Sequence, residues 1–116
     1  MVLIAEEGPE QPIGFLCAFG GREPKWGSLI DNIHVFPTHR GQGCGALLMR
    51  SAATRLVSRH PGMGIHLWVF EANSAGLRFY QKLGGEIVER DTSQIPAANG
   101  ETVLRLHWPD PCRLFE

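Results

Sequence analysis

The chain has 116 residues, of which 43% are apolar and 20% are charged, and its formal net charge is -1. These values predict a single soluble domain, residues 1–116, with an ordinary hydrophobic core. The absence of a basic excess argues against a nucleic-acid partner, and no apolar run approaches the roughly 18 residues that would indicate a membrane span.

The first part of the chain predicts three short strands at residues 3–6, 13–19 and 28–35. The first two flank a cluster of glycine and proline at residues 8–12, so they are expected to form an antiparallel hairpin. Residues 20–25 predict a loop before the third strand. Pro37 ends that strand, because proline cannot donate a hydrogen bond to a neighbouring strand.

The second part predicts two helices and three further strands. Residues 45–59 form an amphipathic helix, whose apolar stripe is Leu48, Met49, Ala52, Leu56 and Val57. Residues 65–70 are apolar at nearly every position, as expected for a central strand covered on both faces. A short helix follows, with Ser74 as its N-cap, an apolar repeat at Ala75, Phe79 and Leu83, and Gly84-Gly85 as its stop.

The last strands are expected at residues 86–90 and 102–108, with a loop at 96–100 between them and an irregular tail from Pro109. The order is therefore β-β-β-α-β-α-β-β. A strand–helix–strand crossover in the middle requires one central parallel pairing. The predicted fold is thus an α/β domain with a mixed, mostly antiparallel sheet.

Three glycines, Gly41, Gly43 and Gly45, lie between the third strand and the first helix. Glycine allows a ligand to approach the backbone closely, and a helix N-terminus presents unpaired N–H groups to an anion. Arg40 adds a positive charge beside this turn. The turn either cradles a diphosphate or merely starts a helix. It lacks the Lys of a Walker loop, and residues 44–70 lack the acid that a dinucleotide-binding motif requires.

Two segments resemble the signatures of the GNAT superfamily of N-acetyltransferases. One runs from Ile33 to Gly45 and contains Val-Phe-Pro followed by Arg-Gly-Gln-Gly-Cys-Gly. The other runs from Asn73 to Gly84 and is similar to Asn-x-x-Ala-x-x-Phe-Tyr-x-Lys-x-Gly, with Gly76 in place of the usual alanine. Both occur in the family's order and on the expected elements. The resemblance covers about residues 3–108 and implies the GNAT fold.

The resemblance implies a function: direct transfer of acetyl from acetyl-CoA to a primary amine of a small molecule or a protein. Tyr80 would be the catalytic acid that protonates the departing thiolate. Asn73 would contact the cofactor arm, and the backbone of the third strand would bind the arm as an added strand would. The implied cofactor-binding residues are Ile33, His34, Val35, Arg40, Gly41, Gln42, Gly43, Cys44, Gly45 and Asn73.

Amine acylation needs an unprotonated amine, so a base is useful. We take Asp31 as the catalytic candidate, acting as a proton relay or acceptor-binding group, with His34, Glu71 and water as alternatives. Strand alternation would place Asp31 on the opposite face from Asn32 and His34. A structural role for Asp31 remains open. Cys44 and the three tryptophans are interpreted as packing residues, and no residues predict a metal site.

The family normally has a strand and two helices before the hairpin that begins here at Leu3, and those helices form one wall of the acceptor groove. Without them, apolar sheet surface would be uncovered, so a homodimer is expected. The competing function is a non-catalytic acyl-CoA-binding sensor or assembly module. The three widely spaced cysteines indicate reduced thiols and a cytoplasmic location.

Overall fold

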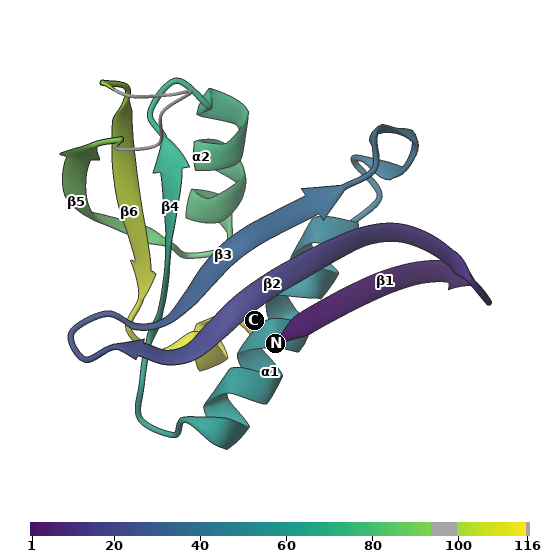
Figure 1. Cartoon of the computed structure of the whole chain (residues 1–116), viewed down its shortest axis with the longest axis horizontal. Helices are drawn as coiled ribbons and strands as arrows, with labels where there is room; N and C mark the ends of the chain where they lie inside the picture. Colours follow the sequence, from purple (N-terminus) through teal and green to yellow (C-terminus); the bar gives the residue numbers. More distant parts are fainter. Residues whose placement is uncertain (94–99, 116) are drawn as a thin grey trace.

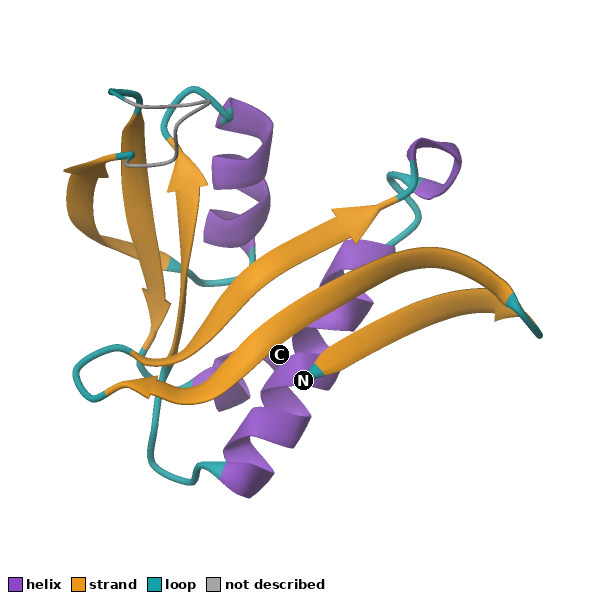
Figure 2. Ribbon diagram, viewed as in Figure 1, coloured by secondary structure: helices purple, strands orange, loops and turns teal. Residues whose placement is uncertain are grey.

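The computed structural model describes residues 1–93 and 100–115, which build one six-stranded sheet and two α-helices (Figures 1 and 2). The elements are β1 (Val2–Gly8), β2 (Gln11–Glu23), β3 (Gly27–Val35), η1 (Pro37–His39), α1 (Cys44–Arg59), β4 (Ile65–Phe70), α2 (Ser74–Lys82), β5 (Glu86–Thr92), β6 (Thr102–Trp108) and η3 (Pro111–Phe115). The predicted order of strands and helices is confirmed.

The sheet has the strand order β1-β2-β3-β4-β6-β5. Every neighbouring pair is antiparallel except β3 and β4, which run parallel and are connected through α1. A parallel pair needs such a crossover because its two strands start at the same edge of the sheet. The mixed sheet with one central parallel pair is therefore as predicted.

Helix α1 supplies much of the core and begins one residue earlier than predicted. Its stripe is buried at Leu48, Met49, Ala52 and Leu56, whereas Val57 is only half-buried. These side chains pack with alternate residues of β2, β4 and β6, among them Leu16, Leu67 and Leu106. The sheet is thus apolar on the face that α1 covers, as alternation in half-buried strands requires.

Helix α2 differs from the prediction in its start and in its buried face. Its N-cap is Asn73 rather than Ser74, because the Asn73 Oδ1 accepts a hydrogen bond from the Gly76 N–H at 3.0 Å. Ala75 is exposed, and Leu77, Tyr80 and Leu83 are the residues that pack against the core. The sequence of this helix contains two overlapping apolar stripes at i, i+3, i+4 spacing. Which stripe is buried depends on the surface against which the helix packs.

Two predicted loops prove to be structured. Residues 20–23 continue β2, and the tail beyond Pro109 forms η3, whose Leu114 is 1% exposed. The Arg50 Nε donates a hydrogen bond to the Leu114 carbonyl at 3.0 Å, which fastens η3 to α1. Of the loop expected at 96–100, only Gly100 lies within the described residues.

Neither α1 nor α2, nor any other helix in residues 1–93 and 100–115, has both the length and the apolar character that a membrane crossing requires.

Candidate functional site

The parallel strands β3 and β4 pair only at their beginnings. The register joins Ser28 to Ile65, Leu29 to His66 and Ile30 to Leu67, and both strands then continue beyond it. Figure 1 shows them diverging toward their C-terminal ends. The edge of β3 beyond Ile30 therefore faces a gap instead of a neighbouring strand.

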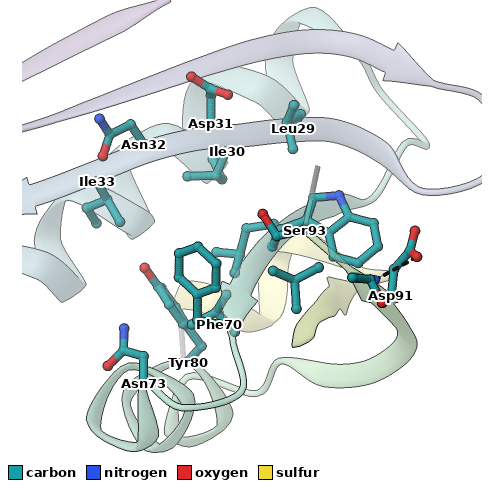
Figure 3. A pocket seen from close by; sticks show the side chains of 15 residues that line it. Leu29, Ile30, Asp31, Asn32, Ile33, Phe70, Asn73, Tyr80, Asp91 and Ser93 are labelled. Atoms are coloured by element: carbon teal, nitrogen blue, oxygen red, sulfur yellow. Dashed lines mark hydrogen bonds between the residues drawn. The ribbon is translucent and has the colours of Figure 1, made fainter. Parts of the chain in front are cut away.

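A β-bulge in β3 lies where this divergence begins. On β2, Ala18 pairs with Ile30 and the preceding Cys17 pairs with Asn32, so Asp31 is the extra residue. A bulge bends its strand and interrupts the alternation of side chains. In Figure 3, Asp31 and Asn32 accordingly project from the same side of β3. The prediction that they occupy opposite faces is wrong.

The gap between the diverging strands holds a cavity of about 520 Å³ (Figure 3). Its walls come from β3, β4, β6, the end of β5, and α2 together with its N-cap residue. Among the lining residues are Leu29, Asp31, Asn32, Ile33, Trp68, Phe70, Asn73, Tyr80, Asp91, Thr92 and Ser93. Asn73 and Tyr80 lie at one end of the view in Figure 3, and Asp91 lies at the other.

Tyr80 presents its phenol to this cavity from α2. Its ring makes edge-on contacts with Phe79 and Trp108, at centroid distances of 5.1 and 6.3 Å. Trp108 is 1% exposed, and its Nε1 donates a hydrogen bond to the Leu83 carbonyl at 3.2 Å. Burial raises the pKa of Tyr80 from 10.0 to about 12, because an apolar environment disfavours the phenolate. The phenol is thus held in place and protonated at neutral pH.

The glycine turn leaves open space at the start of α1. Gly41 and Gly43 have φ angles of 80° and 83°, and no described heavy atom beyond the adjacent residues lies within 4 Å of the position that a Cβ would take at either residue. Gly43 is the N-cap of α1 and provides no side-chain hydrogen bond to the first turn. The first N–H groups of α1 therefore remain available to an anion. This cradle fits a diphosphate.

The other residues of the turn have different surroundings. The exposed Arg40 donates from Nε to the Val35 carbonyl at 3.2 Å. Gln42 is exposed. Cys44 is 7% exposed and belongs to the hydrophobic core, so only its backbone is available to a ligand. At Gly45 a Cβ would lie 3.0 Å from the Phe79 Cζ, which means that glycine lets α1 and α2 approach each other closely.

The three candidate bases, Asp31, His34 and Glu71, lie in different surroundings. Asp31 lines the cavity. The His34 ring instead packs between Phe15 and Phe36, at centroid distances of 5.8 and 5.7 Å. Glu71 forms an ion pair with Arg90, with 3.0 Å between Oε2 and Nη1, and it is outside the set of lining residues. Of the three side chains considered from the sequence, only Asp31 borders the cavity.

Sequence reasoning missed part of the lining of this cavity. Trp68 and Phe70 line it, although tryptophan was interpreted as packing, and Asp91 lies one residue beyond the predicted end of β5. Alternation along β4 could have indicated the first two, because Ile65, Leu67 and Val69 face the core. No local signal points to Asp91. Within residues 1–93 and 100–115, no group of three or more metal-ligating side chains is found.

Comparison with known proteins identifies the family of this fold. The model of the acetyltransferase (GNAT) family matches residues 1–85. The chain belongs to this family. The streptothricin acetyltransferase of Streptomyces lavendulae is 37% identical over 86 residues, a match that covers 71% of this chain and 44% of the relative. The chain thus spans less than half the length of that GNAT relative.

Solved structures share the GNAT fold of this chain. The crystal structure of nourseothricin acetyltransferase has a TM-score of 0.83 and 26% identity, covering 95% of this chain and 65% of that one. A Bacillus anthracis protein in complex with acetyl coenzyme A has a TM-score of 0.77 and 24% identity, covering 91% of this chain and 60% of that one. The predicted GNAT resemblance is confirmed.

Proposed function

We propose that this chain is an N-acetyltransferase that moves the acetyl group of acetyl-CoA to a primary amine. One observation carries the proposal: Tyr80 faces the cavity that opens where β3 and β4 diverge, as Asp31 and Asn73 also do. An acid, a carboxylate and an amide thus border one cavity in a chain of the acetyltransferase family. This combination suits acyl transfer to an amine.

The cofactor would lie along β3 and end at α1. The N–H groups at the start of α1, next to Gly41 and Gly43, would hold the diphosphate, with Arg40 as a nearby cation. The backbone of residues 33–35 would bind the arm along the edge of β3 beyond its last pair with β4. Asn73 keeps its Nδ2 for the arm while its Oδ1 caps α2. The open space at both glycines supports this arrangement.

Acetyl-CoA supplies an activated acyl group: a bond forms from the amine nitrogen to the acetyl carbon while the carbon–sulfur bond breaks. Asp31 would take the proton that the amine loses, directly or through a water. Tyr80 would give its phenolic proton to the departing sulfur and regain one from solvent. With a pKa of about 12, Tyr80 keeps its proton at neutral pH and would donate a hydrogen bond to the sulfur as negative charge develops on it.

The streptothricin acetyltransferase relative suggests where to search for the acceptor. Streptothricin therefore heads the panel of amines, followed by simple alkyl monoamines, diamines and a lysine peptide. The near-neutral charge of the chain, -1, does not choose among these classes.

The test is release of thiol from acetyl-CoA by the wild type and Tyr80→Phe. Phenylalanine keeps the ring contacts with Phe79 and Trp108 and removes only the hydroxyl. We expect kcat to fall by about 100-fold, the low end of what a general acid contributes. Binding is measured separately by thermal shift, since ligand at about 100 times Kd stabilises a protein by about 2.7 kcal/mol.

Two results would contradict the assignment. Equal kcat for the wild type and Tyr80→Phe would remove Tyr80 from the reaction. Thermal stabilisation by acetyl-CoA, without thiol release for any amine, would instead favour a non-catalytic acyl-CoA-binding module.

We further propose that two copies of the chain associate through the face of β1 and β2 that points away from α1. Val2 and Ile4 are 63% and 61% exposed, and their cross-strand partners on β2 are Cys17 and Phe15. These four residues share a face because cross-strand partners lie on the same side of a sheet. An exposed apolar patch of this kind is typical of an interface.

A further inference from the structure

We propose that the acceptor carries a second cationic group and that Asp91 binds it, so the preferred substrates are diamines or larger polyamines. This inference rests on the proposed acetyl transfer. It goes beyond that function in two ways. It assigns a positive charge to the part of the acceptor that does not react, and it names the residue that binds this charge.

The first argument is the charge of the cavity wall. Asp31 and Asp91 are the two charged residues in the lining, and both carry negative charge. The lining residues include no lysine, arginine or histidine. The undescribed residues 94–99, which follow Ser93 of the lining, are Gln-Ile-Pro-Ala-Ala-Asn and contain no charged side chain. An acceptor in this cavity thus meets two carboxylates, and none of the described lining side chains is a cation.

The second argument is that two other carboxylates of this region form ion pairs with arginines, whereas no ion pair is found for Asp31 or Asp91 in the part of the chain that the structure describes. Glu71 pairs with Arg90 at 3.0 Å, and Glu89 pairs with Arg105 at 3.1 Å. Among residues 1–93 and 100–115, the ion pairs found do not include Asp31 or Asp91. Arg90, next to Asp91 in the chain, and Arg105, which stacks on Trp68, are thus already paired with other carboxylates. A substrate ammonium can take the place of a protein cation at Asp91.

The third argument is position. Asp91 lies at the opposite end of the cavity from Asn73 in Figure 3, whereas Tyr80 lies at the Asn73 end. Asp91 Oδ1 accepts a hydrogen bond from the Thr92 N–H at 2.7 Å, which fixes the carboxylate and leaves Oδ2 to a ligand. The walls between the two ends include Trp68 and Phe70, which provide apolar surface for a methylene chain. One amine can thus approach Tyr80 while another reaches Asp91.

The experiment compares kcat/KM for α,ω-diamines of increasing chain length with that for monoamines of the same length. We expect the wild type to prefer one range of diamine lengths by about fivefold, the upper range for an ion pair at an exposed carboxylate such as Asp91. In Asp91→Asn the diamine-to-monoamine ratio should fall by about the same factor, through a higher KM for the diamine. Asparagine retains the Oδ1 that accepts from Thr92 and removes the charge.

The matched control is Glu86→Gln. Glu86 is an exposed carboxylate on the same strand, β5, and lies outside the cavity lining. Its substitution removes the same unit of charge, so it should leave the diamine-to-monoamine ratio unchanged. Equal use of diamines and monoamines by the wild type, or an equal fall of the ratio in both variants, would overturn the proposal.

A binding measurement separates this proposal from the proposed transfer. Calorimetry of the same series of α,ω-diamines is performed on the CoA-bound wild type and on CoA-bound Asp91→Asn. Weaker binding in the variant supports the cation site even when no amine releases thiol, a result that would refute the transfer alone. Equal binding by both proteins refutes the cation site even when acetyl transfer occurs.

Discussion

Tyr80 combines two roles in this chain, because the same packing that fixes its ring changes its acidity. Trp108 and Phe79 hold the ring at the wall of the cavity, and burial there raises the pKa of the phenol to about 12. A phenol with a raised pKa is a weaker acid but never loses its proton to solvent at neutral pH. In the proposed reaction, the proton is therefore present in every molecule when the thiolate would leave.

Tyr80 is the single tyrosine of the chain, so its titration can be followed directly by the ultraviolet absorbance of the phenolate. We expect a midpoint near 12 in the folded protein and near 10.0 in the denaturant-unfolded chain. Tyr80→Phe provides the blank. A folded-state midpoint near 10.0 would show that the ring is not desolvated.

The same shift predicts how stability depends on pH. Below pH 10 both states keep the phenolic proton, and Tyr80 contributes no pH dependence. Between pH 10 and 12 the unfolded chain loses this proton while the folded chain retains it, so the free energy of unfolding falls as pH rises. Urea titrations of the wild type and Tyr80→Phe across this range should therefore diverge, with the wild type losing more stability.

At the scale of elements, the site depends on how β3 and β4 begin together and then separate. The pair starts where the Ser28 N–H donates to the Gly64 carbonyl at 2.9 Å. Beside it, Gly27 has a φ of 88°, and a Cβ there would lie only 2.0 Å from the Gly64 oxygen. Glycine at position 27 thus permits the close backbone approach from which the strands diverge.

Gly27→Ala should therefore destabilise the fold strongly. The left-handed conformation costs a non-glycine residue about 1–2 kcal/mol, and the clash with Gly64 adds about 1–3 kcal/mol. Gly62→Ala is the matched control, because Gly62 has a similar φ of 81° but no atom within 4 Å of its Cβ position. Urea unfolding should show a larger loss for Gly27→Ala. Equal losses would mean that the approach to Gly64 is not close.

At the scale of the whole molecule, the two faces of the sheet differ. One face is covered by α1 and contains the fully buried Leu16 and Ala18 of β2. The other face carries Val2 and Ile4 of β1 in exposed positions. Since β1 is also the edge of the sheet, this region can pair with a second copy both through side chains and along the strand.

Ile4→Lys should shift the proposed dimer to monomer in sedimentation velocity at high micromolar concentration, because it places a charge in the apolar patch. Leu47→Lys is the control: Leu47 is 59% exposed and lies on α1, which covers the other face. The control should remain dimeric. A monomeric wild type, or equal dissociation of both variants, would refute association through this face.

The order of elements, the stripe of α1 and the glycine turn could be predicted from the sequence, because each depends on contacts within a few residues. An i, i+4 apolar repeat and a positive φ at glycine are local properties of the backbone. The resemblance likewise identified Tyr80 and Asn73 by their place in a short motif. Asp31 was a candidate because it lies on the third strand just before the Ile33–Gly45 segment.

The tertiary structure decided which of these residues share one cavity. Strand alternation placed Asp31 and Asn32 on opposite faces, but the bulge created by the register with β2 brings them to one side. Glu71 looked available in the sequence, yet Arg90 from β5 neutralises it. Asp91 enters the cavity only because β5 and β6 fold back beside β4. Each of these outcomes depends on pairing between distant segments of the chain, and the local periodicity of the sequence carries no information about such pairing.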